Sequence, residues 1–216
     1  MDIERSAYNI LERVREKGAE GDLIIDEGQT LSLRAQKGQI EEQKVSSNLI
    51  FGLRVVKESR VGTAYSEASN EDALDSMVNQ ALLNASLAKI EPDETITDIS
   101  GSLRTDDEML CPVDNVSIEE KIAFTLSMEE ELLAKEKIKN VPYNGVSDSI
   151  AQRSVFTASG LYAKSKQRYC SASAHALMEY ERKTVMEGSG KVSRKFGELD
   201  YLEIVEETYS LSLIHI

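Results

Sequence analysis

The chain has 216 residues, with 25 Lys and Arg against 38 Asp and Glu, so its formal net charge is −13. This acidic balance argues against a nucleic-acid interface, which needs clustered basic residues. The sequence has two histidines, whereas a His-based zinc site normally takes two or three, so a zinc centre of this kind is not expected. No apolar run approaches the roughly 20 residues that cross a bilayer, and the N-terminus lacks the regions of a signal peptide. Cys111 and Cys170 are too few for a disulfide framework, so we expect reduced thiols in a cytoplasmic protein without a membrane partner.

The first part of the chain predicts a helix followed by antiparallel strands. Apolar residues recur at helical spacing from Ile3 to Lys17, and Gly18 then ends the helix. From Leu23 to Tyr65 the period changes to two, which is typical of successive strands. Arg54 lies opposite an apolar face, so we interpret it as a sheet-surface charge. The expected turns are Lys37–Gly38, Ser47–Asn48 and Glu58–Ser59.

A second helix should follow, capped by Ser69 or Asn70 and ending before Pro92. Its apolar stripe is the most regular in the sequence and predicts packing against the sheet. The stripe comprises Leu74, Met77, Val78, Ala81, Leu82 and Ala85. These elements define an expected domain over residues 1–90. Residues 91–116 lose periodicity and are rich in acids, which indicates a solvated linker.

A second domain is expected over residues 117–210. Ser117 and Glu120 form a capping-box pattern at the start of a helix that should run to about Lys139. Strand-like stretches then lead to a turn at Ser159–Gly160 and to a flexible break at residues 188–190. Asp200 fits the cap of a last helix. Both units read as helix, antiparallel strands, helix, so the predicted fold class is α+β.

The search for chemistry yields no catalytic, cofactor-binding or metal-ligating residue. The sequence contains no phosphate-binding loop, nucleophile elbow or zinc-binding His pair. Cys170 and His175 are five positions apart, which places them on opposite faces of a strand and rejects a thiol dyad. The roles of His175, Cys111 and Cys170 stay open.

Three stretches carry a resemblance to a known family. Residues 49–56 hold a strand with Gly52 and Arg54, residues 60–66 complete a hairpin with Gly62 and Ala64, and residues 70–82 form the helix after it. This arrangement resembles the N-terminal domain of the TldD/PmbA family. Residues 117–210 are similar to its middle domain, and the third, C-terminal domain is absent. The shared motifs are structural.

The resemblance implies a role in cytoplasmic proteolysis. In this family a TldD-type subunit carries zinc on a His-Glu-x-x-x-His helix and pairs with a TldE/PmbA-type subunit that lacks it. The heterodimer acts on unfolded peptides. No position of this chain matches the zinc motif, so no cofactor is expected here and zinc is expected in the TldD-type partner.

Three functions are compatible with these patterns. The first is a truncated TldE/PmbA-type, non-catalytic subunit. The second is a truncated TldD-type metalloprotease whose zinc helix lies beyond the fragment. The third is a non-enzymatic β-rich binding or scaffold protein. Whether the chain is itself an enzyme is left open.

The last six residues favour truncation near Ser210. One reading frame of a transposase adapter used in sequencing libraries encodes residues 211–216. We therefore expect an adapter-derived tail at 211–216 and a natural protein that continues past Ser210.

Overall fold

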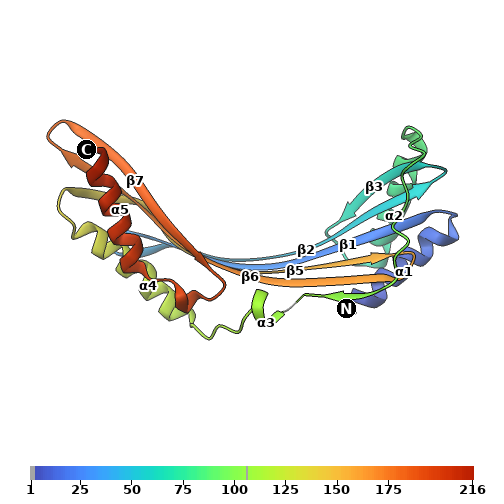
Figure 1. The fold of residues 1–216 in the computed structure, drawn as a ribbon, viewed down its shortest axis with the longest axis horizontal. Coiled ribbons are helices and arrows are strands. Elements are labelled where there is room, and N and C mark those ends of the chain that lie inside the picture. Colours follow the sequence, from blue (N-terminus) through green and yellow to red (C-terminus); the bar gives the residue numbers. More distant parts are fainter. Residues whose placement is uncertain (1–2, 106) are drawn as a thin grey trace. The chain divides into compact units, whose positions relative to one another are not determined.

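The computed structural model describes residues 3–105 and 107–216, and within them the chain is a mixed α+β protein (Figure 1). Its strands form a sheet in the order β3-β2-β1-β5-β6-β4, with β7 paired to β6, which confirms the predicted fold class. The helices of the described ranges do not combine the length and the apolar character that crossing a bilayer demands. In chain order the elements are α1 (Ile3–Glu16), β1 (Glu20–Gln36), β2 (Gln39–Lys57), β3 (Arg60–Ser66), α2 (Glu71–Leu87), β4 (Gly101–Arg104), α3 (Asp107–Leu110), α4 (Ile118–Leu133), β5 (Ile138–Thr157), β6 (Leu161–Tyr180), β7 (Lys183–Ser193), a 3-10 turn (Phe196–Glu198) and α5 (Tyr201–His215).

The chain divides into two compact units that interleave along the sequence. Unit 1 takes residues 1–28, 47–106 and 151–166, and unit 2 takes residues 29–46, 107–150 and 167–216. The units interleave because β1, β2, β5 and β6 are 17 to 20 residues long and each contributes residues to both of them. Ordinary strands have about 5 or 6 residues, so a strand of this length can serve two cores. The consecutive domains at residues 1–90 and 117–210 stay a prediction.

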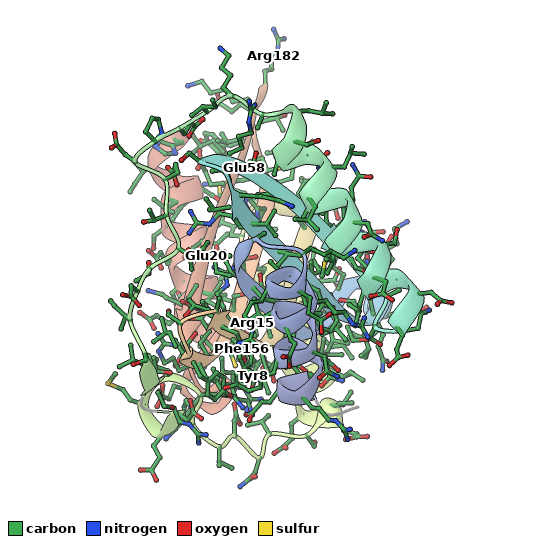
Figure 2. The ribbon with its side chains drawn as sticks, turned by 90° about the vertical axis from the view of Figure 1, so that its right-hand side faces the viewer. Tyr8, Arg15, Glu20, Glu58, Phe156 and Arg182 are labelled. Atoms are coloured by element: carbon green, nitrogen blue, oxygen red, sulfur yellow. The ribbon has the colours of Figure 1, made fainter. Side chains whose placement is uncertain are left out.

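Unit 1 is built around an apolar core between the sheet and two helices. Five members of the predicted α2 stripe are buried, and the sixth, Leu82, packs against the same core. Asn70 caps α2 by accepting a hydrogen bond from Ala73 N at 2.8 Å. Figure 2 shows Tyr8 of α1 beside Phe156 of β5, with ring centroids 5.6 Å apart.

The close contact of α2 with β3 explains one glycine of unit 1. A Cβ on Gly62 would lie 2.1 Å from the carbonyl oxygen of Ala81 and 2.3 Å from the backbone nitrogen of Ala85. Only glycine lets the helix backbone approach the strand this closely.

Unit 2 packs α4 and α5 next to each other, and α5 also contacts β7 (Figure 1). The predicted capping box is confirmed, because Glu120 N donates to Ser117 Oγ at 3.1 Å and Ser117 N donates to Glu120 Oε2 at 2.7 Å. Asp200 caps α5 as predicted. Helix α4 ends at Leu133, before the expected Lys139, because β5 already begins at Ile138.

Two expected breaks lie inside strands. Strand β2 continues through Ser47–Asn48, so the turn predicted there is wrong. Strand β7 likewise continues through Gly188, so the predicted flexible break is also wrong. Gly188 pairs with His175 of β6, and a Cβ at Gly188 would lie 2.3 Å from the imidazole ring. The glycine therefore leaves room for a neighbouring side chain within the sheet.

Two further stretches carry regular structure. The segment expected to be a linker, residues 91–116, contains β4, which pairs in parallel with β6, and the short helix α3. Residues 211–215 continue α5, and His215 Nδ1 lies 2.7 Å from Glu187 Oε1. The adapter origin of residues 211–216 is a statement about the gene and stays a prediction.

Candidate functional site

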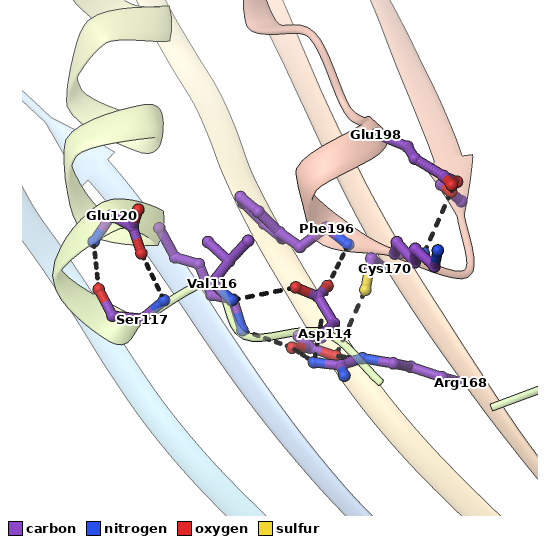
Figure 3. Close-up of polar contacts among 12 residues, drawn as sticks. Asp114, Val116, Ser117, Glu120, Arg168, Cys170, Phe196 and Glu198 are labelled. Atoms are coloured by element: carbon purple, nitrogen blue, oxygen red, sulfur yellow. Dashed lines mark hydrogen bonds and ion pairs between the residues drawn. The ribbon is translucent and has the colours of Figure 1, made fainter. Parts of the chain in front are cut away.

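Unit 2 contains a buried ion cluster that joins α4, β5 and β6 to the segment before α4. Figure 3 labels two of its members, Asp114 and Arg168. The side chains of the cluster are 4% to 10% exposed. Asp148 of β5 lies at the centre and accepts hydrogen bonds from two cations. Arg168 of β6 donates through Nε at 2.9 Å and Nη2 at 2.5 Å, and Lys121 of α4 donates through Nζ at 2.5 Å. Asp114 is the second carboxylate, 3.8 Å from Arg168.

Asp114 connects this cluster to the backbone around it. Its Oδ1 accepts a hydrogen bond from Val116 N at 3.1 Å, and its Oδ2 accepts one from Phe196 N. Figure 3 shows these bonds next to the capping box at Ser117. The carboxylate thereby links the start of α4 to the turn before α5.

The electrostatics favour the ionised forms of Asp148 and Arg168. Burial alone would raise the pKa of Asp148, but the hydrogen bonds and charges of Arg168 and Lys121 outweigh it and lower this pKa. The hydrogen bond to Asp148 raises the pKa of Arg168. Within the cluster, Lys121, Arg168, Asp148 and Asp114 each lie within 4 Å of a group of opposite charge, which is the condition for tolerating charges in a protein interior.

Cys170 lies next to the cluster as a protonated thiol. Its Sγ is 3.4 Å from Asp148 Oδ1 and is fully buried. Burial first, and then the negative charge of Asp148, raises the pKa of Cys170 to about 11. The thiolate is the nucleophilic form, so this side chain is unreactive at neutral pH. Cys111 is partly exposed and not in a disulfide.

His175 belongs to the other face of β6. Burial alternates along this strand, with Cys170 buried and His175 exposed, which agrees with the rejection of a thiol dyad. The His175 ring meets Tyr143 edge-on, with centroids 6.2 Å apart. Arg54, interpreted as a sheet-surface charge, pairs with Asp22 at 2.6 Å and lies 3.5 Å from Glu94.

The sequence motifs do not reveal the ion cluster, because its members are scattered between positions 114 and 168. A usable signal does exist. Asp148 has the same parity as buried Val146, and Arg168 the same parity as buried Cys170 and Ala172. Charges at buried positions of two strands predict an ion pair. Across residues 3–105 and 107–216, no group of three or more His, Cys, Asp or Glu side chains could hold a metal ion.

The described residues also line surface hollows in both units. In unit 1, a hollow of about 440 Å³ lies between β3 and α2, and one of about 170 Å³ lies beside Tyr8 of α1. In unit 2, a hollow of about 280 Å³ is lined by Ser32, Tyr143 and His175. Asn144 also lines this third hollow; its Oδ1 accepts a hydrogen bond from Ala35 N at 3.1 Å.

The fold and the two family models that match the chain define a pair of metallopeptidase-type domains. The model of PmbA/TldA metallopeptidase domain 1 matches residues 21–85, and the model of the PmbA/TldA metallopeptidase central domain matches residues 111–215. Together they match most of the chain, which therefore belongs to the TldD/PmbA family. No curated protein matches it.

Solved structures show the same fold at low identity. A candidate modulator of a DNA gyrase from Thermotoga maritima MSB8 is 16% identical, with a TM-score of 0.82 over 98% of this chain and 48% of that one. TldE from Thermococcus kodakarensis is 15% identical, with a TM-score of 0.81 over 95% of this chain and 46% of that one. A candidate modulator of DNA gyrase from Bacteroides thetaiotaomicron VPI-5482 is 13% identical, with a TM-score of 0.81 over 99% and 50%. The chain thus spans about half the length of these structures.

Proposed function

We propose that the chain supplies the first and central domains of a TldE/PmbA-type subunit, which pairs with a zinc-bearing TldD-type subunit to form a metallopeptidase for unfolded peptides. The observation that carries the proposal is the match to both family domains in order, at residues 21–85 and 111–215. The similarity to TldE from Thermococcus kodakarensis over 95% of the chain supports the same subunit type. A cytoplasmic location is part of this proposal.

The chemistry of the buried acids supports a non-catalytic role for these domains. Asp148 accepts bonds from Lys121 and Arg168, and Asp114 accepts bonds from two backbone N–H groups. A metal ligand needs free lone pairs, and a general base needs access to substrate. Both carboxylates instead stabilise the fold, which supports the proposal that zinc and catalysis lie outside these two domains.

The test is reconstitution with a TldD-type subunit. We expect the purified chain to contain less than about 0.1 zinc per chain and to cleave no unfolded peptide alone, because its described residues bring together no group of side chains that could hold a metal ion. The full-length gene product should co-elute with the TldD-type subunit and support cleavage of an unfolded peptide such as reduced, carboxymethylated casein. One tightly bound zinc per chain, or cleavage by the chain alone, would overturn the proposal.

The second candidate is the TldD-type subunit, which the metallopeptidase description of both matched domains also supports. Sequencing the source gene beyond the codon of Ser210 separates the two. A His-Glu-x-x-x-His motif downstream would assign the chain to the catalytic subunit, and its absence from the complete reading frame would assign it to the TldE/PmbA type.

A further inference from the structure

The outer edge of β3 in unit 1 has outward-facing backbone groups beside a groove. Strand β3 is the last strand of the described sheet on this side, because its neighbour β2 is its one strand partner there. The hairpin between them has a two-residue turn, Glu58–Ser59, with φ of +52° and +56°. Figure 2 labels Glu58 at this turn, with β3 next to α2.

Hairpin geometry decides which residues of β3 face outward. In an antiparallel hairpin with a two-residue turn, the residues that flank the turn form a hydrogen-bonded pair, and such pairs alternate along the strands. Lys57 pairs with Arg60, so Gly62 and Ala64 direct their backbone groups toward β2. Thr63 and Tyr65 therefore direct theirs toward the open edge. Asn84 Nδ2 donates to the carbonyl oxygen of Thr63 at 2.8 Å, which confirms this assignment.

Part of the edge is already covered. Arg60 forms an isolated antiparallel bridge with Ile90, and Glu91 N donates to the carbonyl oxygen of Ser59 at 2.7 Å. This returning segment protects the end of β3 near the turn. The exposed stretch runs from Thr63 to Ser66, and Tyr65 there is 73% exposed.

The hollow of about 440 Å³ lies along this same stretch. Its strand wall is residues 63–66, and its helix wall is one face of α2. Gln80 and Asn84 extend along that wall as an amide ladder, because Gln80 Nε2 donates to Asn84 Oδ1 at 2.9 Å. The helix wall consists of Ala73, Ser76, Met77, Gln80 and Asn84, all uncharged.

We infer that this groove binds an extended, cationic peptide segment, which adds to β3 as an extra strand between β3 and α2. Only an extended backbone presents N–H and C=O groups at the spacing that Thr63 and Tyr65 require, and a strand edge beside a helix is an established peptide-binding arrangement. The inference does not depend on the TldE/PmbA assignment.

Charge favours a cationic peptide over a second copy of this chain. Glu67 follows the strand wall directly, and Asp72 precedes the helix wall, so two exposed acids lie at one end of the groove; the neighbouring Glu71 is paired with Arg13 at 3.9 Å. A second copy carries a net charge of −13 and would bring the same acids against themselves. The acids of two copies would repel each other, whereas these acids would attract Lys or Arg side chains of a peptide.

The probe is a fluorescein-labelled peptide of alternating Thr and Val flanked by Lys, titrated against the full chain by fluorescence anisotropy. The control peptide carries N-methyl groups on the Thr and Val amides and cannot extend a sheet. We expect the control to bind at least about tenfold more weakly, which corresponds to about 1.4 kcal/mol. Equal binding of the two peptides would overturn the inference.

A proline at position 65 removes the outward N–H and leaves the bonds to β2 intact. We expect Tyr65→Pro to weaken peptide binding about tenfold, and Tyr65→Phe, which retains ring and N–H, to bind like the wild type. In the wild-type chain, peptide should slow hydrogen exchange at the Tyr65 amide but not at Ala64. This second measurement needs no variant. An unchanged hydrogen-exchange rate at the Tyr65 amide would contradict the inference even if Tyr65→Pro fails to fold.

Charge neutralisation tests the class of peptide. We expect Glu67→Gln with Asp72→Asn to weaken binding of the Lys-flanked peptide about two- to fivefold at low salt, with a smaller effect at high salt. Unchanged binding would remove the cationic preference. Concentration-dependent dimers that resist added peptide would instead identify a second copy as the occupant and overturn the inference.

Discussion

The two units stabilise their interiors in different ways. Among the described residues of unit 1, the buried polar side chains are the uncharged Ser154 and Thr157. Its ion pairs lie nearer the surface, as with Arg153 and Asp26, whose side chains are 59% and 34% exposed. Unit 2 has an apolar core of similar size but adds Lys121, Asp148 and Arg168 at 10% exposure or less. Unit 1 therefore depends on the fit between backbone and side chains, and unit 2 depends also on charge compensation. The two units should fail in response to different substitutions.

The largest effect should come from removing the central carboxylate of unit 2. Asp148→Asn leaves Lys121 and Arg168 buried, with only the more distant Asp114 as counter-charge, so we expect a loss of about 3–5 kcal/mol of stability. Urea denaturation with hydrogen exchange resolved by unit measures it, and Cys170 should become open to thiol reagents at lower urea concentration.

The matched control is Asp26→Asn, which removes a half-exposed partner of Arg153 in unit 1. An exposed pair is worth about 0–1 kcal/mol, so this variant should remain close to the wild type. Equal losses in the two variants would show that burial of the cluster is not what distinguishes the units.

The corresponding test of unit 1 is steric. Gly62→Ala places a methyl group 2.1 Å from the carbonyl oxygen of Ala81, so α2 must move away from β3, and we expect a loss of about 1–3 kcal/mol. Gly52→Ala, on the neighbouring strand, is the control, because its nearest contact would be Ile24 O at 3.9 Å. Thermal unfolding of the two variants should separate them clearly. A neutral Gly62→Ala would mean that α2 is not fixed on the strand.

Signals that act within a few residues made much of this fold predictable. The caps at Asn70, Ser117 and Asp200 and the stripe of α2 are local patterns, and the structure confirms them. The break predicted at Gly188 is wrong. The glycine is required there because a Cβ would collide with the His175 ring on the neighbouring strand. Local chemistry cannot reveal such a contact.

The pairing within the ion cluster and the β3 groove could not be predicted from the sequence, for the same reason. The cluster joins residues up to 54 positions apart, from 114 to 168, and alternation alone does not show which charges meet. The groove needs the hairpin register and the position of α2 on β3. Both are products of tertiary structure, whereas family membership was carried by short structural motifs that survive in the linear sequence.

Lowering the pH should remove part of the stability that the ion cluster contributes to the folded chain. The pKa of Asp148 is lower in the folded chain than its ordinary value of about 3.8, so its contribution to stability is complete above that value and is lost as the pH falls toward the folded pKa. We expect the stability difference between wild type and Asp148→Asn to shrink as the pH falls from about 5 to 3. Denaturation at each pH measures the difference, and one that grew on acidification would contradict the lowered pKa.

The smallest effects should be those of the helix caps, where the two units are built alike. Asn70→Ala in α2 removes the bond from Ala73 N, and Ser117→Ala in α4 removes the bond from Glu120 N. Each should cost about 1 kcal/mol, measured by urea denaturation. Equal stability losses in the two cap variants would show that the units differ in how their interiors are stabilised and not in their helix caps.

An unequal result would be informative in one direction. Ser117 directly follows Val116, whose N–H donates to Asp114 in the ion cluster. If Ser117→Ala costs well above 2 kcal/mol while Asn70→Ala costs about 1, the cap and the cluster act together, and a double variant with Asp148→Asn should lose less than the two single losses combined. Simple additivity in that double variant would show that the cap stabilises α4 alone.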